Sequence, residues 1–281
     1  GRQALEQNTA SNNTAVGRLA LYANTTGTAN VALGTNALDA NTTRHNNTAL
    51  GYRALTSQTV ADANTAVGAD SLYSNTTGEN NTAQGFMALY ANTTADHNTA
   101  VGFQTLRLNN TGTQNAAFGS KALDANTTGN GNTAVGMDAL GANTTADYNT
   151  AVGEAALVLN TSGTQNTALG RQAGNSITTG SNLTVIGYDA DASSATATNE
   201  ITLGNSSVST LRCNTQTISS LSDGRDKTEV ENLPLGLDFI DTLRPVKFKW
   251  DTRDGNGKDG SYEAGFIAQD LQSAQSTSDA E

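Results

Sequence analysis

The five-residue phrase Asn13-Thr14-Ala15-Val16-Gly17 recurs along the chain with small changes and always ends in glycine. A fixed short period is typical of a solenoid, in which each repeat is one supersecondary unit stacked on the next. The glycines that end the copies are spaced 17 residues apart: Gly17, Gly34, Gly51, Gly68, Gly85, Gly102, Gly119, Gly136, Gly153, Gly170, Gly187 and Gly204. This spacing limits the possible folds more than any other feature of the sequence.

Two further positions keep the same period. A leucine recurs from Leu21 to Leu157, and an asparagine recurs from Asn24 to Asn160 with Gln58 in one of its places. The consensus reads N-T-A-V-G-x-x-A-L-x-x-N-T-T-G-x-x. The first copy, which ends at Gly17, is one residue shorter than the others, so we expect the chain to be a fragment that begins inside a longer array.

The composition argues against several other classes of protein. Only 36% of the residues are hydrophobic and 5% are aromatic, which is too little for a large globular core. The net charge of −11 argues against nucleic acid or an anionic membrane as a partner. The chain has no apolar run long enough to cross a membrane, and its single cysteine, Cys213, excludes an intrachain disulfide framework. Because it also has no phosphate-binding loop and no zinc-type histidine spacing, we expect no cofactor and no metal.

A 17-residue period is too short for a helical-hairpin repeat and fits one coil of a parallel β-solenoid. Thr-Ala-Val would form a short strand, closed by a glycine that tolerates a positive φ. Ala20-Leu21 would lie on a second short strand or a bend, and Asn24 to Gly27 would form the loop to the next coil. Stacking then places identical side chains about 4.8 Å apart, which predicts hydrogen-bonded ladders of asparagine and of threonine.

Each repeat offers only about one Val, one Leu and two Ala for burial. Their burial offsets a small part of the entropy lost when 17 residues are ordered. Packing the outer face of each coil against other copies would add to the stability. We therefore expect a homo-oligomer with cyclic symmetry along the solenoid axis.

The repeat resembles the head repeats of trimeric autotransporter adhesins, which run A-I-G-x-x-A-x-A-x-G. Ala15-Val16-Gly17 and Ala20 match that pattern, and the resemblance covers roughly residues 1–204. It implies a left-handed parallel β-roll with three chains to a head.

Three features of the repeats allow two interpretations each. The Asn-Thr-Thr triplets match the N-glycosylation pattern, but we favour stacking ladders because the repeat dictates them. His45 and His97 lie near matching loop positions, and we favour solvated loop residues over a metal site. The two variable positions after each glycine, such as Arg18-Leu19 and Phe103-Gln104, form either a ligand-facing stripe or trimer contacts.

The sequence divides into a solenoid over residues 1–204, a β linker over 205–221 and a second domain over 222–281. In the linker, short strands would lead out of the solenoid, with Cys213 either buried or in contact across a trimer axis. In the second domain we expect a helix between Pro234 and Pro245 and a strand in the alternating residues 246–250. A return strand at 262–266 and a helix at 267–274 would complete a small α+β domain.

Three motifs in the second domain resemble the C-terminal intramolecular chaperone of phage tail fibres and tailspikes, peptidase family S74. They are Ser222-Asp223-Gly224-Arg225-Asp226-Lys227, then Leu243-Arg244-Pro245-Val246 with Phe248-Lys249-Trp250, then Gly265-Phe266-Ile267-Ala268-Gln269-Asp270. The resemblance covers residues 222–275. It implies a domain that drives trimerisation of the fibre and then cuts itself off between Ser222 and Asp223, with Ser222 as nucleophile and Lys227 as its base.

The chemistry of this dyad depends on its surroundings. A serine hydroxyl needs an adjacent base, and a lysine serves as one only where burial or neighbouring groups lower its pKa. Asp223 and Asp226 flank Lys227, and nearby carboxylates raise the pKa of a lysine. The alternative is that Ser222 and Lys227 only begin the chaperone fold.

Together these observations predict a trimeric fibre of a virion tail that attaches to a glycan or protein on a host surface. Its enzymatic activity would be limited to autoproteolysis. One alternative is a trimeric adhesin of a bacterial cell surface. Another is a glycan-degrading tailspike, although a regular array leaves little room for a pocket.

Overall fold

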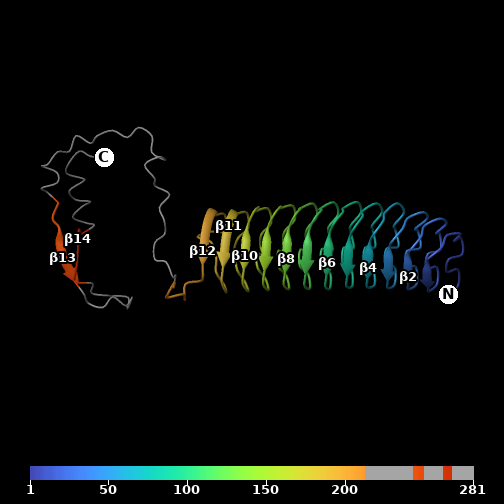
Figure 1. Ribbon diagram of the computed structural model, residues 1–281, viewed down its shortest axis with the longest axis horizontal. Coiled ribbons are helices and arrows are strands. Elements are labelled where there is room, and N and C mark those ends of the chain that lie inside the picture. The colour runs from blue at the N-terminus through green and yellow to red at the C-terminus, as the bar shows by residue number, and fades with distance from the viewer. Residues whose placement is uncertain (213–242, 250–261, 268–281) are drawn as a thin grey trace, which may run out of the picture. The chain divides into compact units, whose positions relative to one another are not determined.

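The structure is a computed structural model that describes residues 1–212, 243–249 and 262–267 (Figure 1). The chain divides into two compact units, Gly1–Leu211 and Arg212–Glu281, and each is described by itself. The part of the chain that is described contains no helix and therefore none that could span a membrane.

The first unit is a single parallel sheet whose twelve strands follow one another in sequence order, one strand to each coil (Figure 1). Partner residues in adjacent strands are 17 apart, as in the pairing of Ala15 with Ala32. This confirms the predicted β-solenoid of 17-residue repeats. The strands are β1 (Thr14–Val16), β2 (Val31–Leu33), β3 (Thr48–Leu50), β4 (Thr65–Val67), β5 (Thr82–Gln84), β6 (Thr99–Val101), β7 (Ala116–Phe118), β8 (Thr133–Val135), β9 (Thr150–Val152), β10 (Thr167–Leu169), β11 (Ser181–Ile186) and β12 (Thr198–Leu203).

The middle residue of each short strand points into the solenoid and its two neighbours point outward. Ala32 is fully buried, whereas Val16 and Leu33 are exposed. The expectation that each coil would bury its valine is therefore wrong, because side chains alternate along a strand and the alanine takes the interior position. The apolar interior of most coils consists of one leucine and two alanines, such as Leu38, Ala32 and Ala37.

The Ala-Leu pair of each coil lies in a turn, and residues 1–212 contain no second row of strands. The repeated leucine has a left-handed backbone, with φ of 50° at Leu21 and 49° at Leu72. This conformation is unusual for a leucine. It is held here because the side chain is fully buried and the Leu21 N–H donates to the carbonyl of Ala37 in the next coil (3.0 Å).

Two asparagines complete the interior of each coil. Asn30 donates its backbone N–H to the Oδ1 of Asn13 (2.9 Å), and Asn41 donates from Nδ2 to the Oδ1 of Asn24 (2.8 Å). The side chains of Asn30 and Asn41 also donate to the carbonyl of Arg44 (2.7 and 3.3 Å). Most of these buried amides are bonded to neighbouring coils, so they hold the stack together and leave few buried polar groups unsatisfied.

The repeated glycine is required by both backbone and packing. Gly136 has φ of 135°, and a Cβ built on it would lie 2.4 Å from the carbonyl oxygen of Gly153 in the next coil. Such a contact with backbone leaves no room for any other residue.

The last coils replace the interior amides with aliphatic side chains. Ile177 and Leu183 stand where the two asparagines would be, and Val185 replaces the strand alanine. Strands β11 and β12 are also longer, with six residues each. Residues 205–212 contain no strand, so the predicted linker strands are absent from the described part of the linker; Cys213 lies outside it.

In the second unit the structure describes one antiparallel pair, β13 (Val246–Lys249) and β14 (Tyr262–Gly265), in which Val246 is opposite Gly265. Both strands were predicted, each extending one residue further. The two predicted helices fall largely outside the described residues, and the described ends of their ranges, 243–245 and Ile267, are not helical.

Candidate functional site

The predicted autoproteolytic residues Ser222, Asp223 and Lys227 lie outside the described residues. The dyad and the scissile bond therefore stay predictions. The described residues offer two other places to search for function, which are the polar network along the loops and the outer surface of the coils.

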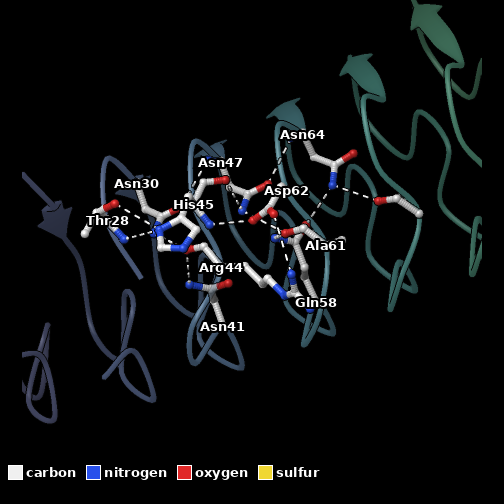
Figure 2. Close-up of polar contacts among 11 residues, drawn as sticks. Thr28, Asn30, Asn41, Arg44, His45, Asn47, Gln58, Ala61, Asp62 and Asn64 are labelled. Atoms are coloured by element: carbon white, nitrogen blue, oxygen red, sulfur yellow. Dashed lines mark hydrogen bonds and ion pairs between the residues drawn. The ribbon is translucent and has the colours of Figure 1, made fainter. Parts of the chain in front are cut away.

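The ladder of buried asparagines is interrupted in the third coil, which contains β3. Gln58 occupies the asparagine position there, and its longer side chain donates from Nε2 to the carbonyl of Ala61 (2.8 Å) and accepts at Oε1 from Asn64 (3.1 Å) (Figure 2). Among the described residues, no group donates to the Oδ1 of Asn41, which is buried. The Oδ1 of Asn160 is also left without a partner there, since Ile177 follows it in the next coil.

The ladder explains the Asn-Thr-Thr triplets. From Asn75 to Asn160 each asparagine of this position is fully buried, and five successive Nδ2 groups donate to the Oδ1 of the preceding coil. A buried and bonded amide is not accessible to a glycosyl donor in the folded protein. The interpretation as stacking ladders is confirmed.

His45 belongs to a column of side chains that cap the backbone of the preceding coil. Its Nδ1 accepts from the N–H of Thr28 (3.0 Å), and its own N–H donates to the Oδ1 of Asp62 (2.7 Å) (Figure 2). Asn130 caps Thr113 in the same way (2.8 Å). The acceptor role of Nδ1 places the ring proton of a neutral His45 on Nε2.

The histidines form no metal centre in the described part of the chain. His97 is exposed and lies one position later in its coil than His45. Nowhere in that part do three His, Cys, Asp or Glu side chains gather as metal ligands. What the structure shows for His45 is a structural contact, since its ring accepts a hydrogen bond from the backbone of the preceding coil.

An aromatic and charged cluster covers part of the surface in coils three to five. The guanidinium carbon of Arg53 lies 4.9 Å from the ring centres of both Tyr52 and Tyr73, and its Nε lies 2.8 Å from the Oδ1 of Asp70. Tyr73 in turn stacks on Tyr90, with ring centres 5.1 Å apart and planes within 7°. Because the rings stack along the solenoid axis, this cluster offers ring edges and hydroxyls more than open ring faces to a ligand.

Two carboxyl groups of the solenoid have altered acidity. Burial raises the pKa of Asp39, although Thr56 donates to it (2.6 Å). The hydroxyl and backbone N–H of Ser193 lower the pKa of Glu200 through hydrogen bonds of 2.6 and 2.8 Å. Burial dominates the shift at Asp39 and hydrogen bonds dominate the shift at Glu200.

Exposed apolar side chains gather on both sides of the glycine row. We call this surface the glycine-flanking ridge. It comprises the third residue of each of β1–β10 and the last residue of β11 and β12, from Val16 to Leu203, and the residue that follows each glycine, from Arg18 to Asn205. Phe86 and Phe103 in this ridge stack with ring centres 5.7 Å apart. The row of residues after each glycine was recognised in the sequence as variable. The row of last strand residues was missed, because the valines were expected to be buried.

Comparison with known families identifies the C-terminal part of the chain. Residues 222–278 match the family described as the chaperone of endosialidase, peptidase S74. No curated protein and no solved structure matches the chain. The match at residues 222–278 and the parallel β-solenoid earlier in the chain together fit a tail fibre that carries a C-terminal chaperone of this family.

Proposed function

We propose that this protein is a homotrimeric fibre of a virion tail that attaches to a host surface. In this proposal the C-terminal domain assembles the trimer and then releases itself by cleavage between Ser222 and Asp223. The observation that carries the proposal is the order of the two parts, a long parallel β-solenoid followed by a chaperone-of-endosialidase match at residues 222–278.

The solenoid is suited to a fibre because its contacts are repeated between neighbouring coils. The backbone N–H of Thr48 donates to Asn64 and that of Thr65 donates to Asn81, both at 2.9 Å. Such a stack extends without a change of structure and presents its outward side chains at fixed intervals. Variable outward residues on a regular scaffold give a surface on which a host receptor can be recognised.

The proposed self-cleavage follows from the chemistry of a serine–lysine dyad. Lys227 would take the proton of the Ser222 hydroxyl of one copy. The serine oxygen would then attack the carbonyl carbon of the Ser222–Asp223 bond in another copy of the trimer, because attack on its own carbonyl would close a strained four-membered ring. The peptide bond would break with a proton supplied to the new amino group of Asp223. This step frees the chaperone, and water would then hydrolyse the remaining serine ester, which restores the serine hydroxyl and gives a fragment with a free carboxyl group at Ser222.

Intact mass spectrometry and light scattering of the full-length chain test the proposal. Wild type should yield a fragment ending at Ser222, while Ser222→Ala and Lys227→Met stay whole. Ser219→Ala is the matched control and should cleave as wild type does. If wild type stays uncut, as Ser222→Ala is expected to, the proposed cleavage is refuted. A monomeric mass for the folded chain would refute the trimer. Attachment is tested with an array of bacterial surface glycans and with intact cells, and the absence of binding to both would refute it.

A further inference from the structure

We infer that the glycine-flanking ridge is the surface through which copies of this chain pack, parallel and in register. The inference rests on the proposed homotrimer and adds the face that forms it. It also decides between the two interpretations of the variable row, because it assigns the residue after each glycine to contacts between copies.

The distribution of exposed apolar side chains supports this assignment. Of the 19 large hydrophobic side chains that are exposed in residues 1–203, 13 belong to the ridge. A contiguous apolar strip is unusual on an isolated soluble protein and marks a surface of interaction. The ridge members are Val16, Leu33, Leu50, Tyr52, Phe86, Phe103, Phe118, Val135, Met137, Leu169, Ile186, Tyr188 and Leu203.

The ridge is also nearly free of net charge, although the chain carries −11. Its strand row has no charged residue between Val16 and Leu203. After Arg18, the other row has only Glu154 and Arg171, which form an ion pair with each other (Nε to Oε2, 3.1 Å). Charged groups are depleted at the centres of protein interfaces, because burying an unpaired charge is costly.

The two rows have the geometry that a closed ring of parallel copies requires. A three-fold interface is heterologous, so each copy must offer two different surfaces that fit each other. The rows run side by side along the same axis, with the same spacing of about 4.8 Å, and are separated by a glycine that has no side chain. In some coils one row has a large residue where the other has a small one, as with Phe118 and Ser120 on either side of Gly119.

The area is sufficient for a specific contact. Twelve strands spaced about 4.8 Å apart give a row roughly 53 Å long. With a width of about 10 Å, one row of one copy against one row of the next buries on the order of 1,000 Å² in total, which is the lower end for a stable interface. A ligand site would occupy one part of the solenoid, whereas this strip extends from the first coil to the last.

Two triple variants of the full-length chain test the inference. The ridge variant is Leu50→Glu, Val135→Glu and Leu169→Glu. The control is Val60→Glu, Leu108→Glu and Leu159→Glu, whose side chains are equally exposed (43, 39 and 51%, against 39, 37 and 49%) but lie outside the ridge. All six side chains point outward, so both variants should keep the circular dichroism of the wild type.

The mass of each variant is measured by light scattering over a dilution series. We expect the ridge variant to dissociate at a protein concentration at least tenfold higher than wild type, and the control to behave as wild type. If both variants stay trimeric at every concentration, the inference is overturned while the proposed trimer stands. A monomeric wild type would overturn both.

Disulfide cross-linking gives a second readout if the ridge variant does not fold. Two tagged copies, one with Leu169→Cys and one with Arg171→Cys, are co-expressed with Cys213→Ser in both. A mixed disulfide between the two copies is expected, because the two rows meet in register. Its absence, with a mixed disulfide formed instead between Leu159→Cys and Arg171→Cys copies, would overturn the inference.

Discussion

Replacing Gln58 with asparagine should stabilise the solenoid locally, because it would restore an interrupted ladder. An asparagine at this position would donate to the buried Oδ1 of Asn41, which has no partner among the described residues, and would accept from the Nδ2 of Asn75. It would lose the bond that Asn64 now makes to Gln58, but Asn64 keeps its bond to the carbonyl of Gly78 (2.8 Å).

The expected gain can be estimated from these contacts. The net addition of one hydrogen bond is worth about 1 kcal/mol, and pairing a buried oxygen removes a penalty of about 1–3 kcal/mol. Loss of one buried methylene costs about 0.8 kcal/mol. The net stabilisation is therefore about 1–3 kcal/mol, which corresponds to a factor of roughly 5–150 in the population of the locally opened state.

Hydrogen exchange measured by mass spectrometry is the suitable assay, because stability in a repeat protein is largely a nearest-neighbour property. The amides of β3 and β4 should exchange about 5–150-fold more slowly in Gln58→Asn than in wild type. Asn126→Gln is the matched control, since it inserts the same interruption into an intact ladder and should accelerate exchange in β7 and β8. Unchanged exchange in both variants would refute the assignment of stability to the ladder.

Further predictions concern single groups. Gly136→Ala should destabilise the array by about 3 kcal/mol or more in chemical denaturation, because both the backbone φ and the contact of the added Cβ are unfavourable. Gly141→Ala is the control, because its φ is ordinary and its Cβ would meet nothing closer than 3.1 Å. It should change the stability by less than about 1 kcal/mol. His45→Leu should cost about 1 kcal/mol by removing the acceptor for a backbone N–H, and His45→Asn should restore most of it, as thermal melts would show. Hydrogen bonds from Ser193 lower the pKa of Glu200 in the folded protein. The charged carboxylate therefore stabilises the fold at pH values above the pKa of the unfolded state, and this stabilisation is lost as pH falls through the pKa of the folded state. Glu200→Gln should therefore remove the acid sensitivity of exchange in β12, and an unchanged pH profile would contradict this.

The architecture of the solenoid was predictable because one period controls it. The glycine spacing set the coil length, and the strand positions followed from Thr-Ala-Val. The orientation of those strands was not predicted, because a three-residue strand can bury either its middle residue or its outer two. The choice depends on the interior, which has room for Ala32 and Leu38 but not for Leu33 as well.

Some details of the candidate surfaces lay beyond sequence reasoning for physical reasons. The gap in the asparagine row at Gln58 was visible, but its effect on Asn41 depends on how far the longer amide reaches. The left-handed backbone at the repeated leucine could not be expected, since leucine rarely adopts it. The motif that begins at Ser222 was recognisable, and the family match covers it, but its catalytic geometry is still a prediction.

The constant pairing offset of 17 residues makes the solenoid a molecular ruler. A gene deletion or duplication of 17 codons within the regular part of the array, for example residues 98–114, would rejoin surfaces that already fit each other. Rod length would change in increments of about 4.8 Å. Insertions whose length is not a multiple of 17 would shift both amide rows out of register. The length of natural or engineered versions of this solenoid should therefore vary in whole coils. Its length can change in this way without any change in the sequence of the individual coil.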